Sequence, residues 1–193
     1  EQWRTRARAL LARGLAPHEV QGQIDGTSHD LFAAEGVEEG CAPAAAIAVS
    51  RELLETLQTA ACFRSPERWS FLYKVLWRWQ RGEKDVLSPA DRDGSRLHAM
   101  VKAVRRERHD MHAYLRFRER APHLGPPRFV AWYEPVHDVL ESVAEHFAAR
   151  MGSASWLIAT PEASALWDGS RLHHGPAVMQ GPEDIDDRGE RLW

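Results

Sequence analysis

The chain has 193 residues and a mass of 21.9 kDa, the length of one ordinary domain or of a domain with an appendage. With 44% hydrophobic and 27% charged residues it lies in the globular range, which excludes a wholly disordered or collagen-like chain. No run of about 18 apolar residues is present, so we expect no membrane span.

The two cysteines, Cys41 and Cys62, are too far apart in sequence for a CxxC site. They could form at most one disulfide, which is few for a secreted domain stabilised by disulfides. We therefore expect a reducing, cytoplasmic environment. The sequence starts at Glu1 without a recognisable signal peptide, which favours a segment trimmed or cut from a longer chain.

The net charge of −3 conceals an uneven distribution along the chain. Between Arg64 and Arg128 there are 16 lysine and arginine residues against 8 acidic ones, so both ends are acidic and the middle is basic. Of the 25 basic residues, 22 are arginine, whose planar guanidinium suits phosphates and base edges but is also common in GC-rich genomes. The pattern predicts a localised positive field.

The N-terminal part reads as two short helices followed by a linker. Apolar residues from Trp3 to Leu11 follow helical spacing that Gly14 can end, and Pro17 opens a second helix. From about Gln21 the periodicity gives way to glycine, proline and alanine. We predict an N-terminal helical appendage at 1–20, a linker at 21–49 and one domain at 50–193.

The helical part of this domain begins with a helix capped by Ser50 and a second helix after Ser65 and Pro66. A long helix is predicted from Ser95 to about Arg120, with its apolar side chains on one side and its basic side chains opposite. The preceding helix likewise has a basic face.

In the last third the sequence predicts alternating strands and helices. Residues 129–134 alternate with period two as a half-buried strand does, and Pro135 starts a helix that ends near Gly152. A strand is predicted at 156–159, a short helix at 160–166 and a weak strand at 171–174, before an acidic tail from 181 onward. The fold class predicted is α+β, mostly helical, with a small antiparallel sheet.

The sequence lacks the motifs of several common chemistries. The phosphate-binding patterns GxxxxGK[ST] and GxGxxG are missing, as are GxSxG and HExxH. His109 and His112 on the long helix, with Glu134 and His137 near Pro135, could ligate zinc or iron if their elements pack together. A histidine pair at this spacing on an exposed basic face is more often simply solvated, so we expect no metal and no cofactor. His109, Glu134 and His137 stay the catalytic candidates of an alternative, enzymatic function.

The basic helix faces are a stronger signal and predict nucleic-acid binding. The long helix presents a stripe of about 20 Å, enough to follow several phosphates. The preceding helix adds a second basic face beside two aromatic rings, Trp77 and Tyr73, that could stack on bases. Its cations are Lys74, Arg78 and Arg81. The candidate nucleic-acid-binding residues are Lys102, Arg105, Arg106, His109, Arg116, Lys74, Arg78 and Trp77. The alternative is that an amphipathic helix in an arginine-rich chain simply has a basic outer face.

Five separated blocks, within about residues 50 to 175, match a known family in order. They are RWSFLYKVLWR at 68–78, MVKAVRRERHDM at 100–111, RFRE at 116–119, FVAWYEPVH at 129–137, and WLIATP with ALWDG at 156–169. In these blocks the chain resembles a bacterial domain of unknown function found in proteins attributed to DNA metabolism or repair. That domain often stands beside a uracil-DNA-glycosylase-like domain and is paired genomically with a radical S-adenosylmethionine protein.

The resemblance implies a DNA-repair context. It implies no enzymatic activity, because the domain has no established function that could be assigned to this chain. We expect an accessory module that binds DNA, single-stranded or damaged, and works with a uracil-DNA-glycosylase-like domain or a radical S-adenosylmethionine protein. The alternatives are an enzyme acting on DNA or a nucleotide, and a protein-interaction domain that does not bind nucleic acid. Uracil excision by this chain is not expected, because the motifs of glycosylases are missing. The matched blocks add Trp132, Trp156, Thr160 and Trp167 to the candidate functional surface.

Overall fold

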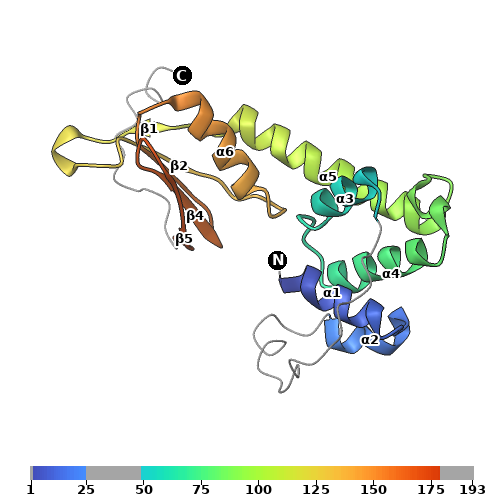
Figure 1. The fold of residues 1–193 in the computed structure, drawn as a ribbon. Helices are drawn as coiled ribbons and strands as arrows, with labels where there is room; N and C mark the ends of the chain where they lie inside the picture. Colours follow the sequence, from blue (N-terminus) through green and yellow to red (C-terminus); the bar gives the residue numbers. More distant parts are fainter. Residues whose placement is uncertain (1, 25–48, 179–193) are drawn as a thin grey trace. The chain divides into compact units, whose positions relative to one another are not determined.

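The computed structural model describes residues 2–24 and 49–178 and divides the chain into two compact units, 1–103 and 104–193 (Figure 1). The division falls inside one long helix, α5 (Arg92–Tyr114), which contributes its first half to one unit and its second half to the other. Most of the predicted linker and the whole acidic tail lie outside the described residues.

The first unit is helical. Its elements are α1 (Gln2–Ala12), α2 (Pro17–Ile24), α3 (Arg51–Ala60), α4 (Arg68–Gln80), the 3-10 turn η1 (Lys84–Leu87) and the first half of α5. Ser50 caps α3 as predicted, because its hydroxyl accepts the backbone N–H of Leu53 at 3.1 Å. Gly14 follows α1 with a φ of 69°, a backbone conformation that glycine adopts without strain.

The N-terminal helices are part of the core of this unit and are not a separate appendage. Leu10, Leu11 and Val20 are buried in one apolar cluster with Leu72 and other side chains of α3, α4 and α5. The hydroxyl of Tyr73 on α4 donates to the backbone carbonyl of Leu15 at 2.6 Å, which ties the turn between α1 and α2 to this core. The helices on the two sides of the predicted boundary near residue 50 thus share one apolar cluster, because an amphipathic helix must bury its apolar side and α4 offers the surface for it.

The second unit contains a five-stranded sheet in the order β1-β2-β3-β4-β5. Its elements after α5 are β1 (Arg118–Glu119), the 3-10 turn η2 (Pro122–Leu124), β2 (Phe129–Trp132), α6 (Leu140–Met151), β3 (Trp156–Ala159), β4 (Ala163–Trp167) and β5 (Leu172–Pro176). Strands β2 and β3 pair in parallel and the other neighbours are antiparallel, so the sheet is mixed and not purely antiparallel. The parallel pair follows from α6, which carries the chain back between β2 and β3.

Helix α6 packs against the sheet at β4 and β5. Val143, Ala144 and Phe147 are buried on its inner side, and Trp156 and Ile158 of β3 are completely buried. The ring of Phe117 lies 5.1 Å from that of Phe147 and 5.9 Å from that of Trp156. These aromatic contacts join the segment after α5 to the core of the second unit.

Two predicted helices of this unit differ in the structure. The helix expected from Pro135 begins only at Leu140, since the backbone N–H of Val136 donates to Glu107 on α5 at 3.2 Å instead of starting a helix. The helix expected at 160–166 is strand β4. The hydroxyl of Thr160 accepts the N–H of Ala163 at 3.1 Å and donates to its carbonyl at 2.8 Å, which forms the tight turn between β3 and β4.

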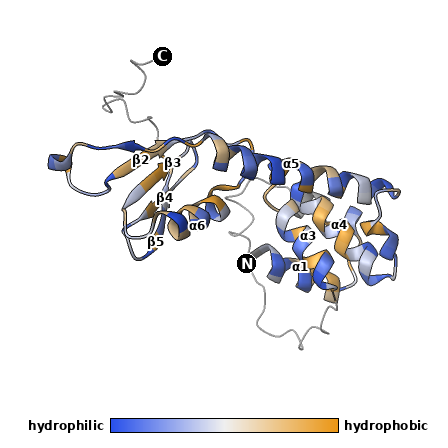
Figure 2. Cartoon of the chain, turned by 90° about the horizontal axis from the view of Figure 1, so that it is seen from above, coloured by the Kyte–Doolittle hydropathy of each residue, from blue (hydrophilic) through white to orange (hydrophobic). Residues whose placement is uncertain are grey.

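The α+β class, mostly helical, is confirmed. Figure 2 shows hydrophobic residues on α4 and on the strands, whereas α5 is hydrophilic along much of its length. No helix within the described ranges has the length and apolar character needed to cross a membrane.

Candidate nucleic-acid interface

One side of α5 carries a row of exposed, mostly basic side chains, called here the α5 crest and made up of Lys102, Arg105, Arg106 and His109. Val104 and Met111 lie on the opposite side of the helix and are fully buried. This alternation follows from the helical period of 3.6 residues, which separates the apolar and the basic positions of the segment. The sequence predicted both faces correctly.

The charges of the crest are weakly compensated. Arg106 lies 3.6 Å from Asp110 in an (i, i+4) pair on the exposed surface. Among the residues that the structure describes, Lys102 and Arg105 have no acidic partner within 4 Å. Between Lys102 and Arg128 the sequence has eight lysine and arginine residues against three acidic ones. On the crest itself Asp110 offsets one cation, Arg106, while Lys102 and Arg105 have no acidic partner among the described residues, so positive charge is left at this surface after local pairing.

Arg116 does not belong to the helical row, although it is exposed. Helix α5 ends at Tyr114, so the prediction that it continues to Arg120 is wrong. The chain leaves the helix because Arg118 and Glu119 pair with β2. The guanidinium of Arg116 instead donates to the carbonyls of Ala113 and Leu115, at 2.7 and 3.2 Å, and so satisfies the end of α5.

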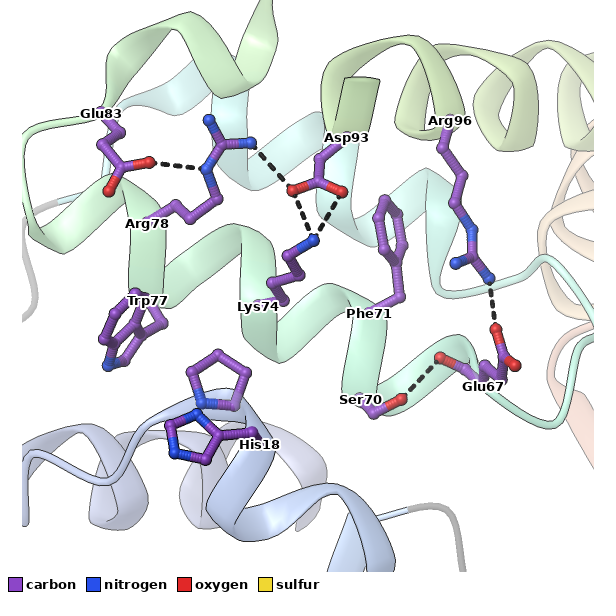
Figure 3. Close-up of a pocket in the computed structure, with 11 residues that line it drawn as sticks. His18, Glu67, Ser70, Phe71, Lys74, Trp77, Arg78, Glu83, Asp93 and Arg96 are labelled. Carbon is purple, nitrogen blue, oxygen red and sulfur yellow. Dashed lines mark hydrogen bonds and ion pairs between the residues drawn. The ribbon is translucent and has the colours of Figure 1, made fainter. Parts of the chain in front are cut away.

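The cations of α4 have a different environment. Lys74 lies 2.9 Å from Asp93. Arg78, whose side chain is 15% exposed, donates to Glu83 at 2.7 Å and to Asp93 at 2.9 Å (Figure 3). It also donates to Asp91 at 2.8 Å. These hydrogen bonds, with Asp91 first and Glu83 second, raise the pKa of the Arg78 guanidinium, and the Arg78 guanidinium holds the pKa of Asp91 well below its usual range.

The predicted second basic face is thus neutralised by carboxylates from the turn between α4 and α5. Asp91 also accepts the backbone N–H groups of Asp93 and Gly94, at 2.9 Å each, and caps the start of α5. Gly94 is required there, because a Cβ at this position would lie 2.0 Å from the carbonyl oxygen of Ser88. Lys74 and Arg78 therefore connect α4 to the start of α5 through these carboxylates. Little of their positive charge is left for a phosphate.

The aromatic neighbours of these cations also differ from expectation. Tyr73 is completely buried and cannot stack on a base, and burial raises the pKa of its hydroxyl. Trp77 is half-buried, and the guanidinium of Arg81 lies 4.7 Å from its ring centre. Trp77 is the aromatic residue of α4 that keeps an accessible surface at the pocket shown in Figure 3.

The His/Glu constellation does not form a metal centre in the described part of the chain, where no group of three or more potential ligands could hold an ion. His109 is exposed on the α5 crest, whereas His137 is 8% exposed in the segment before α6. Glu134 accepts the indole N–H of Trp132 at 3.2 Å. Within the described residues the three candidates therefore do not form one ligand set.

The remaining candidates from the matched blocks have structural contacts. Trp156 is completely buried, and Thr160 forms the turn described above. The indole of Trp167 donates to the carbonyl of Gly152 at 2.6 Å, which joins the end of β4 to the end of α6. These three side chains therefore have structural roles within the second unit.

A pair of histidines near α6 was not foreseen from the sequence. The rings of His112 and His146 lie 4.2 Å apart, and the Nε2 atom of His112 is buried without a hydrogen-bond partner among the described residues. Burial lowers the pKa of His112, and the neighbouring His146 lowers it further. His146 carried no signal, because its distance to His112 depends on how α6 packs against α5.

The comparisons with known proteins identify a family. Residues 66–193 match a family model described as a domain of unknown function, DUF4130. Neither a curated protein nor a solved structure matches the chain. The match begins just before α4 and covers well over half of the sequence, whereas α1, α2 and α3 precede it. The chain therefore belongs to the family of the domain of unknown function DUF4130.

Proposed function

We propose that this chain is a nucleic-acid-binding accessory module of DNA repair and that the α5 crest is its contact to the phosphate backbone. The observation that carries the proposal is the accumulation of exposed, weakly compensated cations on one side of a helix whose other side is buried. Such a row attracts DNA independently of sequence, through the release of counterions from phosphates. A module of this kind needs no chemistry of its own.

The repair context rests on the resemblance of the five sequence blocks. On that basis the partner protein is a uracil-DNA-glycosylase-like domain or a radical S-adenosylmethionine protein, and the ligand is single-stranded or damaged DNA. The module would hold the DNA while the partner acts on a base. The cytoplasm is the proposed location.

The test is charge reversal of the crest. The double variant Arg105→Glu and Arg106→Glu should weaken binding of a single-stranded DNA oligonucleotide more than about tenfold at low salt. For each phosphate that the variant no longer binds, the slope of log affinity against log salt should fall by about 0.7 for single strands or about 0.9 for duplex DNA. Fluorescence anisotropy over a salt series measures both quantities.

A matched control reverses two exposed arginines in another part of the chain. Arg8→Glu with Arg13→Glu changes the net charge by the same amount, in and directly after α1. If this control weakens binding as much as the crest variant, the effect reflects net charge and the crest is not the interface. Unchanged DNA binding by a folded crest variant would contradict the proposal.

A further inference from the structure

The first unit contains a pocket of about 550 Å³, a volume typical of small-molecule sites. Helix α4 forms one wall, the start of α2 another, and the beginning of α5 closes it (Figure 3). The lining residues are Pro17, His18, Glu67, Ser70, Phe71, Lys74, Trp77, Arg78, Glu83, Asp93 and Arg96. All of them lie in the same compact unit.

The charges around this pocket are balanced pair by pair. Asp93 faces both Lys74 and Arg78, as described above, and Arg96 lies 2.9 Å from Glu67. A phosphate entering the pocket would have to compete with carboxylates that already bind these cations. The pocket therefore favours an uncharged ligand that can both donate and accept hydrogen bonds.

The pocket also has one accessible aromatic surface. The guanidinium of Arg96 lies 4.4 Å from the ring centre of Phe71 and covers that ring. The half-buried ring of Trp77 borders the pocket at the end where the imidazole of His18 enters from α2 (Figure 3). The guanidinium of Arg81, which is not a lining residue of the pocket, lies 4.7 Å from the centre of this indole, so a planar heterocycle would stack on the face that Arg81 does not cover.

Polar groups next to this surface can bind the edge of such a ligand. His18 is exposed, and its ring can donate or accept according to its tautomer. Lys74 is 47% exposed and retains N–H groups beyond those that bind Asp93.

We propose that this pocket binds an uncharged nucleobase stacked on Trp77, with its polar edge toward His18 and Lys74. The inference rests on the proposed function and extends it, because it assigns base recognition to the first unit in addition to phosphate contact at the α5 crest. An unstacked base of a single strand has the planar shape and the mixed donors and acceptors that the pocket requires.

The test uses compounds without phosphate. Deoxyadenosine, deoxycytidine, deoxyguanosine and thymidine are titrated into the full chain, together with their 5′-monophosphates, and binding is followed by saturation-transfer NMR and calorimetry. We expect at least one nucleoside to bind with a millimolar or lower Kd and its monophosphate to bind no more than about twofold tighter. A monophosphate that binds more than about tenfold tighter would instead indicate a phosphate site.

The substitution Trp77→Ala should weaken nucleoside binding at least about fivefold, as expected for the removal of one stacking ring, and Trp77→Phe should restore part of the affinity. Tyr114→Ala is the matched control, since Tyr114 is a 66% exposed aromatic residue outside the pocket. If Trp77→Ala does not fold, the variant His18→Ala provides the test, because this side chain is exposed at the pocket and is not in the buried apolar core.

Binding of no nucleoside, or binding unchanged in the folded variants, would overturn the proposal. The crest variant Arg105→Glu with Arg106→Glu separates this inference from the proposed function, because nucleosides carry no phosphate and should bind that variant unchanged. A defect of the phosphate interface would appear only with DNA. A defect of the base pocket would appear with nucleosides, while the salt dependence of DNA binding stays the same.

Discussion

The positive charges of the two compact units lie in opposite environments, paired with carboxylates in the first and exposed in the second. In the first unit the cations of α4 face the carboxylates of Glu83, Asp91 and Asp93, and Arg78 is mostly buried among them. In the second unit Arg105 and Arg106 are exposed on α5, with one acidic residue, Asp110, at 3.6 Å from Arg106. Both helices carry cations on one face of an amphipathic segment.

The role of a basic face therefore depends on what packs beside it. The turn that leads into α5 brings two aspartates to α4, and the resulting network joins the two helices by charge-assisted hydrogen bonds. No described element brings carboxylates to Lys102 and Arg105 in the same way. The first set of cations stabilises the fold, and the second is available for a ligand.

The first unit depends on its N-terminal helices, and their removal should have the largest effect. Deleting residues 1–24 takes Leu10, Leu11 and Val20 out of the core. At about 1.5–3 kcal/mol per buried side chain, the free energy of unfolding should fall by at least about 4 kcal/mol. Urea denaturation measures this free energy. A deletion variant as stable as the full chain would restore the view of a separate appendage.

The contrast between the two sets of cations can be tested with a matched pair of substitutions. Arg78→Met removes the cation that Asp91 and Glu83 share and leaves Asp93 with Lys74 alone, so Tm should fall by more than about 5 °C. Arg106→Met removes only an exposed pair and should change Tm by less than about 2 °C. Circular dichroism during heating measures both. Equal decreases of Tm in the two variants would show that the two sets of cations do not differ in their contribution to stability.

The smallest effect concerns the histidine pair of the second unit. Because the pKa of His112 is lowered in the folded state, the unfolded chain takes up a proton first as the pH falls. The stability is complete above the usual histidine pKa of about 6.5 and decreases as the pH falls toward the lower folded value. Unfolding between about pH 7 and pH 5 should show this decrease, and His112→Phe should reduce it. An unchanged pH dependence in that variant would assign the effect to other groups.

The local features of the fold were predictable from the sequence because they depend on neighbours along the chain. Ser50 capping, the end of α1 at Gly14 and the opposite faces of α5 all follow from spacing within a few residues. The exposure of Arg105 and Arg106 belongs to this class, since a helix that buries Val104 and Met111 must turn these arginines outward. The α+β class followed from the change of period near residue 129.

Only the tertiary structure decided which of these side chains have interaction partners from distant segments of the chain. The sequence places Arg78 on a basic face in the same manner as Arg105, yet the turn before α5 surrounds Arg78 with carboxylates. Trp77 and His18 meet at one pocket because α2 packs against α4, although 59 residues separate them in the chain. Contacts between distant segments depend on how their apolar faces are buried together, and the periodicity of a single segment does not specify that arrangement.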